Sequence, residues 1–394
     1  MAELDYDAIL TNALNQGASD VHLKAGVPPI IRLQGELIHL KGFEPLRPDE
    51  LARVAFAIMN ENQKETFKEK HQVDLGYSIS GVGRFRVNAF LQRGAVGIVF
   101  RIIPLNIKNF KELHLPPVIQ KLSEEMRGLV LVTGITGSGK STTLASMVDH
   151  INKTRSCHIM SIEDPIEYAH RDQKSVINQR EIGVDAPSFA ESLKAALRQD
   201  PDVILVGEMR DLETIDIALT AAETGHLVLS TLHTIDATET INRIVAAFPP
   251  FQQKQIRIQL AGILKGVISQ RLIPTKDGKE RVPAIEVMVS NSRIRSCIID
   301  KDKTKEIVDA IFKGQHTYQM QTFDQSIMQL LGQQLITYEE ALKQSSNPDD
   351  FALKVKGGVI SSTGSEYDEF SDSTEKAADA TEFPESDDDE IERF

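Results

Sequence analysis

The chain has 394 residues, enough for two domains, and none of its apolar runs reaches the roughly 18 residues that a membrane-spanning helix needs. Its start, MAELDYDAIL, lacks the basic and apolar regions of a signal peptide. Thirteen acidic and two basic residues lie between Glu366 and Phe394, so this tail carries −11 of the net charge of −13. The nearly neutral body gives no overall charge argument for nucleic acid. Cys157 and Cys297 form neither a disulfide framework nor a zinc module, and we expect ordinary thiols in a reducing cytoplasm.

The first part of the chain predicts a small α+β domain over residues 1–104. Segments such as GRFRVNAFLQRGAVGIVFRII alternate apolar and polar residues, with glycine breaks that suit hairpin turns. Residues 105–120 predict a linker with a short helix that Pro116 and Pro117 stop.

From Gly128 onward the pattern predicts a mostly parallel sheet covered by helices. Short apolar runs at 129–133, 158–162, 203–207 and 227–232 alternate with helical stretches. We expect one α/β domain over 121–353, in which 250–353 is mainly helical. The segment 354–394 is rich in Ser, Asp and Glu and predicts disorder. It suits either a solubilising tail or an electrostatic interaction tail.

The stretch GITGSGKS, residues 134–141, matches the P-loop pattern G-x-x-x-x-G-K-[ST] between a predicted strand and a predicted helix. Glycines let consecutive backbone N–H groups turn toward phosphate oxygens, and the helix N-terminus adds positive potential. Lys140 is expected to reach the β- and γ-phosphates of ATP, and Ser141 to ligate Mg²⁺. The candidate nucleotide-binding residues are Gly134, Thr136, Gly137, Ser138, Gly139, Lys140, Ser141 and Thr142.

Acidic residues follow two further predicted strands. Glu208 follows VILVG, at the edge where parallel sheets bind ligands, and we expect it to orient or activate the attacking water. The alternative is a surface acid. Glu163 and Asp164 follow HIMSI, and we expect Glu163 to position water or Mg²⁺, directly or through water. A solvated turn before Pro165 is the alternative there.

Two histidines flank the predicted strand LVLSTL. At about 3.3 Å per residue they lie roughly 20 Å apart, so both cannot touch one phosphate. His233, at the carboxyl edge, is expected to sense the γ-phosphate, whereas His226 is expected to order the preceding turn or meet a neighbouring surface.

These motifs, with GASDVHLKAGVPPIIRLQGE and GRFRVNAF in the first domain, resemble the type IV pilus retraction ATPases of the PilT/PilU family, within the secretion ATPase superfamily. The resemblance spans about residues 5–345. It implies a PAS-like domain over 1–104, a RecA-like ATPase domain over 121–353, and a homo-hexameric ring that hydrolyses ATP with Mg²⁺ to power pilus retraction and twitching motility. It also implies a position at the cytoplasmic face of the inner membrane, peripheral to it. The implied partners are an inner-membrane pilus platform protein and a paralogous retraction ATPase, with no nucleic acid.

The resemblance also assigns residues. It gives ATP binding to 134–142, catalytic roles to Glu163 and Glu208 beside Lys140, and a histidine box to His226 and His233, which adds His226 to the residues near the nucleotide. It makes Arg84 and Arg86 subunit-bridging arginines that supply charge to the phosphoryl group.

Other functions stay open on the motifs alone. A PilU-like accessory retraction ATPase, a pilus assembly or type II secretion ATPase, a nucleic-acid translocase and a small-molecule P-loop kinase all use such a site. The extra N-terminal domain and four-cysteine zinc module typical of extension ATPases are not expected here, which favours the retraction branch. The near-neutral body counts against the translocase, and the first domain offers the kinase no obvious lid.

Overall fold

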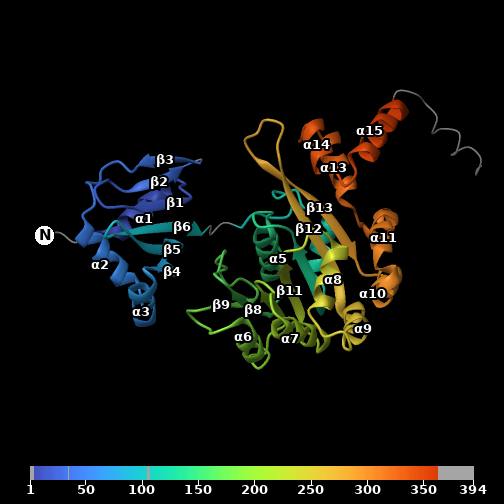
Figure 1. The fold of residues 1–394 in the computed structure, drawn as a ribbon, viewed down its shortest axis with the longest axis horizontal. Helices are drawn as coiled ribbons and strands as arrows, with labels where there is room; N and C mark the ends of the chain where they lie inside the picture. The colour runs from blue at the N-terminus through green and yellow to red at the C-terminus, as the bar shows by residue number, and fades with distance from the viewer. Residues whose placement is uncertain (1–3, 34, 104–106, 363–394) are drawn as a thin grey trace, which may run out of the picture.

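The computed structural model describes residues 4–33, 35–103 and 107–362, with side chains up to Lys356. Two groups of elements follow one another along the chain, and each has a hydrophobic core of its own (Figure 1).

The first group is an antiparallel sheet with helices packed on it, which confirms the predicted α+β class. Within the described residues its six strands lie in the order β3-β2-β1-β6-β5-β4. They are β1 (Asp20–Leu23), β2 (Ile30–Leu33), β3 (Glu36–His39), β4 (Gln72–Ile79), β5 (Gly83–Gln92) and β6 (Ala95–Ile103). The helices are α1 (Tyr6–Asn15), α2 (Pro48–Ile58) and α3 (Glu61–Lys70). On β5, Phe85 and Val87 are fully buried while Arg86 is exposed, as the alternating pattern predicts.

The connection between the two groups differs from the prediction. The short helix α4 (Pro117–Ser123) begins at the prolines instead of ending there, with Pro117 in its first turn. Proline suits that position because its missing N–H would have no partner within the helix.

The second group is built on a larger sheet. Within the described residues it has seven strands in the order β13-β12-β7-β11-β10-β8-β9. All neighbours are parallel except β12 and β13. The strands are β7 (Gly128–Thr133), β8 (His158–Glu163), β9 (Val176–Glu181), β10 (Val203–Val206), β11 (Leu227–Leu232), β12 (Leu264–Pro274) and β13 (Arg281–Val289).

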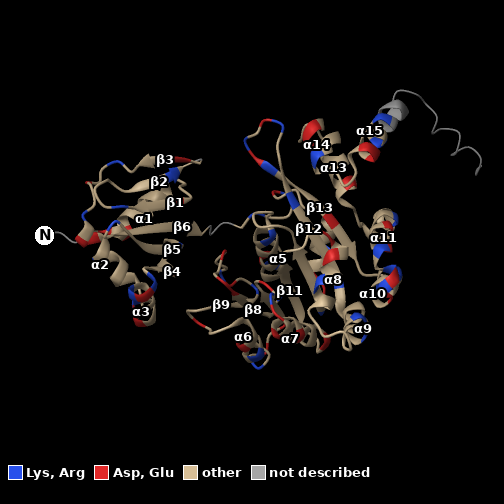
Figure 2. Ribbon diagram, viewed as in Figure 1, with Lys and Arg blue, Asp and Glu red and all other residues tan. Residues whose placement is uncertain are grey.

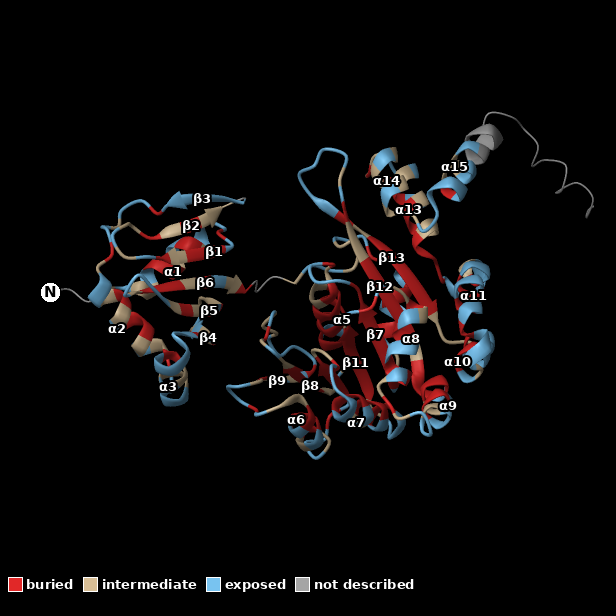
Figure 3. Ribbon diagram, viewed as in Figure 1, coloured by how far each residue is buried: buried red, intermediate tan, exposed pale blue. Residues whose placement is uncertain are grey.

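The central strands are apolar on both faces because helices cover both. On β7, Leu129 and Leu131 belong to one hydrophobic cluster, and Val130 and Val132 to another on the opposite face. Figure 3 shows these central strands as buried along their length. Unbroken apolar runs are what such doubly covered parallel strands require.

The helices of the second group are α5 (Lys140–Thr154), α6 (Phe189–Ala196), α7 (Leu212–Glu223), α8 (Ala237–Ala246), α9 (Gln253–Ile263), α10 (Ser292–Ile299), α11 (Ile307–Lys313), α12 (Gln315–Tyr318), α13 (Phe323–Gly332), α14 (Tyr338–Gln344) and α15 (Pro348–Ser362), with a 3₁₀ turn at Lys301–Glu306. None of the described helices combines the length and apolar character that a bilayer crossing requires.

Two features of this part differ from the predictions. Residues 250–353 are mainly helical, as predicted, but β12 and β13 form a long antiparallel pair within them that was not predicted. The predicted disorder from residue 354 does not hold for 354–362, which continue α15. The rest of the predicted tail lies outside the described residues.

Candidate ATPase site

The P-loop lies between β7 and α5, as the sequence predicts. Lys140 begins α5, is 8% exposed, and its Nζ donates to the backbone oxygens of Gly134 at 2.8 Å and Ile135 at 3.0 Å. Gly134 has a φ of 143°, and a Cβ there would lie 2.4 Å from the Ser138 hydroxyl. Only glycine therefore lets the loop close this tightly.

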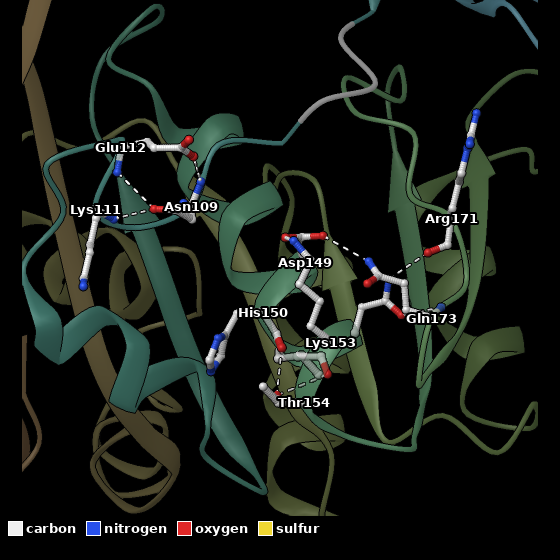
Figure 4. A network of polar contacts seen from close by, with 11 residues as sticks. Asn109, Lys111, Glu112, Asp149, His150, Lys153, Thr154, Arg171 and Gln173 are labelled. Carbon is white, nitrogen blue, oxygen red and sulfur yellow. Dashed lines mark hydrogen bonds and ion pairs between the residues drawn. The ribbon is translucent and has the colours of Figure 1, made fainter.

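The far half of α5 anchors the loop that follows Glu163. The side-chain amide of Asn152 donates to the carbonyl of Arg171 at 2.8 Å, and its oxygen accepts from the Gln173 N–H at 3.1 Å. Asp149 pairs with Lys153 and accepts from the Gln173 side chain (Figure 4). One helix thus carries the P-loop lysine at its start and fixes the loop at its end.

Glu163 ends β8 and lies among neutral donors. Its carboxylate accepts hydrogen bonds from the Ser161 hydroxyl at 2.7 Å and the Gln179 amide at 3.2 Å. Burial raises the pKa of Glu163, and these two hydrogen bonds oppose the shift without reversing it. The carboxyl group is therefore easier to protonate than an ordinary glutamate.

Glu208 follows β10 and has charged neighbours. Its carboxylate lies 2.7 Å from Arg210 Nη2 and 3.3 Å from His233 Nε2. Burial opposes ionisation, but hydrogen bonds and charges from Arg210 and His233 outweigh it, so the pKa of Glu208 is lowered. Glu208 is thus an ionised carboxylate at neutral pH, held in place by two partners.

The lysine and the two glutamates meet at one cavity of about 450 Å³ at the carboxyl edge of the sheet. Burial lowers the pKa of Lys140, whereas the carboxylates of Glu208 and Glu167 oppose that shift. Nine predicted site residues line the cavity: Thr136, Gly137, Gly139, Lys140, Ser141, Thr142, Glu163, Glu208 and His233.

Other predicted site residues lie elsewhere. Gly134 and Ser138 lie against each other within the P-loop and do not line the cavity. His226 lies at the amino end of β11, where its ring bonds the Ala221 carbonyl at 2.9 Å. The strand separates it from the cavity, so the structure supports the turn-ordering alternative over nucleotide contact. Arg84 pairs with Glu181 of its own chain at 2.6 Å, and Arg86 lines a second cavity beside β9.

Several residues of the cavity were not predicted. Tyr168 exchanges a hydrogen bond of 2.8 Å with the Thr142 hydroxyl, and Arg210 holds Glu208. His170 also lines the cavity, and burial lowers its pKa to about 4, so it is neutral at neutral pH. Arg281 comes from β13, in a region predicted to be helical. Two quoted segments offered a sequence signal for these residues: SIEDPIEYAH, which carries Tyr168 and His170 just beyond Glu163, and DPDVILVGEMRD, which carries Arg210 just beyond Glu208.

The cavity suits a nucleoside triphosphate by the chemistry of its donors. It offers a buried lysine, the N-terminus of a 15-residue helix and loop N–H groups to phosphate, with carboxylates beyond them. In the part of the chain that the structure describes, no three His, Cys, Asp or Glu side chains form a group that could hold a metal. Mg²⁺ is usually bound by one or two protein groups together with phosphates, and Ser141 and Glu163 fit that role. The fold and this site define a P-loop ATPase.

The family follows from comparison with known proteins. The model of the Type II/IV secretion system protein family matches residues 2–347, and the chain belongs to that family.

The chain aligns with named relatives over most of its length. This chain is 46% identical over 348 residues to the type IV pilus retraction ATPase PilT of Pseudomonas aeruginosa, and the alignment covers 88% of this chain and 100% of that one. It is 42% identical to the type IV pilus ATPase PilU of the same organism, covering 90% and 92%. A crystal structure of the pilus retraction motor PilT with bound ADP has a TM-score of 0.81 and 49% identity, covering 88% of this chain and 99% of that one.

Proposed function

We propose that this chain is the ATPase motor of type IV pilus retraction and so powers twitching motility. One observation carries the proposal. The chain matches a PilT over the full length of that relative. In the structure, the P-loop lysine Lys140 and the ionised carboxylate of Glu208 line one cavity. Both groups are what ATP hydrolysis needs.

In the proposed reaction, water attacks the γ-phosphorus of ATP, and the bond from that phosphorus to the oxygen bridging it to ADP breaks. Glu208 accepts the proton of the attacking water, so its ionised state matters. Lys140 stabilises the negative charge on the phosphate oxygens. Ser141, and Glu163 directly or through water, would hold Mg²⁺, which would supply neutralisation of the phosphate charge. Arg210 and His233 keep the Glu208 carboxylate in place and ionised.

We further propose an assembly in which the chain acts as a homo-hexameric ring. The ring is peripheral to the inner membrane at its cytoplasmic face and works against an inner-membrane platform protein. Arg84 and Arg86 are proposed to serve a nucleotide on a neighbouring subunit. The mass of the particle in solution with ATP tests the ring: six chains support it, and a monomer at working concentration contradicts it.

The pilus phenotype of a deletion strain tests the motor's direction. Retraction function predicts extra, non-retracting fibres on cells that lack the chain. Bald cells would instead support an assembly or type II secretion ATPase. A strain supplied with the Lys140→Ala chain should match the deletion, since that chain lacks the phosphate-binding cation.

An accessory, PilU-like role is the second candidate, because the chain also matches PilU over 92% of that relative. It predicts that deletion leaves retraction nearly normal while a paralogous motor is present. Deleting both separates the two roles, because an accessory ATPase expressed alone then fails to restore fibre shortening.

A further inference from the structure

A buried carboxylate links the first domain to the loop that lines the ATPase cavity. Glu181 ends β9, is 3% exposed and belongs to neither the P-loop nor the predicted acids. Its Oε2 lies 2.6 Å from Arg84 Nη2 on β5 and also accepts a hydrogen bond from the Ile166 backbone N–H at 3.2 Å. One oxygen atom therefore touches both domains.

The second contact matters because of where Ile166 lies. It is in the segment that follows Glu163, between Asp164 and Glu167, both of which line the nucleotide cavity. Glu181 is also the register partner of Glu163 across the parallel pair β8–β9. Moving the Glu181 carboxylate therefore moves the backbone of the cavity wall.

In the first domain, a glycine on strand β4 leaves space for the ion pair between Arg84 and Glu181. On the neighbouring strand β4, Gly76 is the register partner of Arg86, and a Cβ there would lie 2.9 Å from Arg84 Nη2 and 3.1 Å from Glu181 Oε1. Any other residue at that position would crowd the two charges. Beside them, a cavity of about 430 Å³ is lined by Arg86 from the first domain and by Asp164 and Val184 from the second.

We propose that Glu181 is a positioning residue of the ATPase site: its carboxylate holds Arg84 and the 164–168 loop together, so that the position of the first domain is transmitted to the nucleotide cavity. The proposal rests on the proposed ATPase function. In this arrangement Arg84 acts on the loop of its own chain through Glu181, which is an alternative to the action on a neighbouring subunit proposed for it above.

A double-mutant cycle tests the link. Glu181→Gln keeps an acceptor for the Ile166 N–H but removes the charge that faces Arg84. We expect it to lower kcat on the order of tenfold, with a smaller change in KM for ATP, because residues in contact are energetically coupled. Adding Glu181→Gln to Arg84→Ala should then cause little further loss. The matched control is Arg86→Ala, on the same strand face without this contact, where the two losses should multiply.

Gly76→Ala disturbs the pair without changing any charge. The added methyl group crowds the guanidinium, so kcat should fall in the same direction as in Glu181→Gln, by a smaller factor. Multiplicative losses in the Arg84 cycle, together with a Gly76→Ala chain of normal kcat, would overturn the proposal.

A spectroscopic measurement separates this proposal from the ATPase assignment. The chain contains no tryptophan, so Val184→Trp places a single reporter beside the ion pair. Its emission should change in intensity or wavelength when Glu181→Gln or Gly76→Ala is added, because the charged groups beside it move. Val176→Trp, at the other end of β9, should not respond. An unchanged emission at position 184 contradicts the link. A wild-type chain that hydrolyses no ATP contradicts the proposed function instead, and the emission still tests the contact.

Discussion

Two glutamates at the ends of neighbouring strands have opposite electrostatic environments. Glu163 is surrounded by neutral donors and its pKa is raised by burial, whereas Glu208 faces Arg210 and His233, which lower its pKa despite burial. When the environments of two neighbouring carboxyl groups shift their pKa values in opposite directions, the two groups suit different roles. Glu208 suits proton acceptance at neutral pH, and Glu163 suits hydrogen bonding and water positioning.

Replacing Glu208 with glutamine should block hydrolysis and preserve binding. The amide keeps the shape of the side chain but cannot accept the proton of the attacking water, so kcat should fall by about 10²–10⁴. A titration with labelled ATP, run beside a phosphate-release assay, checks both parts. Glu213→Gln on the exposed start of α7 is the control. If binding and turnover fall together, Glu208 is a metal ligand or a structural residue.

The pH profile of kcat distinguishes the two glutamates. A base must be ionised to act, so activity is lost as the pH falls through its pKa. With Glu208 as the base, the acidic limb should lie below the ordinary glutamate value of about 4.3, and kcat should be flat between pH 6 and 8. A limb displaced above the ordinary value would instead identify Glu163, whose pKa is raised.

The chemistry of the site could be predicted from the sequence residue by residue, but its partners could not. Lys140, Glu163, Glu208 and His233 line one cavity because each follows or begins an element with a clear pattern. Arg210 follows β10, as Glu208 does, but its contact with Glu208 depends on the direction of the side chain, which the order of residues does not determine.

At the scale of elements, the strand that was not predicted begins directly after a helix, with no turn between them. Helix α9 ends at Ile263 and β12 begins at Leu264, so no linker residue separates them. Proline and turn clusters are the usual signals of such a boundary, and they are missing here. As a result the predicted sheet lacked β12, which pairs in parallel with the P-loop strand β7.

The misassigned strand pair contains a buried acid with a testable pH effect. Glu286 of β13 accepts a hydrogen bond from the Ala237 N–H at the start of α8, and burial raises its pKa to about 7. An acid whose pKa is raised in the folded state adds stability at low pH, and that contribution is lost as the pH rises through about 7.

Glu286→Gln should therefore raise the melting temperature by several degrees at pH 8 and much less at pH 5, because glutamine keeps the acceptor and cannot ionise. Thermal unfolding followed by circular dichroism at both pH values measures this difference. Glu280→Gln, exposed in the neighbouring hairpin, should show no such dependence. An equal effect of Glu286→Gln at both pH values would mean that Glu286 does not titrate in this range.

At the scale of the whole molecule, charge is spread over both domains. Figure 2 shows acidic and basic residues mixed along the outer helices of the second domain, for example on α10 and α11. The sequence could predict two domains from the change in pattern at Gly128. It could not predict that Arg84 meets Glu181, because 97 residues separate them and the contact depends on how the domains pack.

The proposed ring predicts complementation between two inactive chains. Arg86→Ala should bind ATP and form rings but hydrolyse slowly, since an arginine acting across an interface contributes about 10³–10⁵ in rate. Mixing it with Lys140→Ala should restore part of the turnover, because an intact P-loop can face an intact arginine. If mixed rings form and no ratio recovers activity, the arginines do not act between subunits.

Fibre length in living cells tests the central claim most directly. A strain that lacks the chain, with fluorescently labelled pili, receives either the wild-type chain or Glu208→Gln, and single fibres are followed over time. The account predicts that the wild-type chain restores shortening and that Glu208→Gln, which binds ATP without hydrolysing it, leaves fibres extended. Equal shortening with Glu208→Gln, or cells without fibres when the chain is absent, would contradict it.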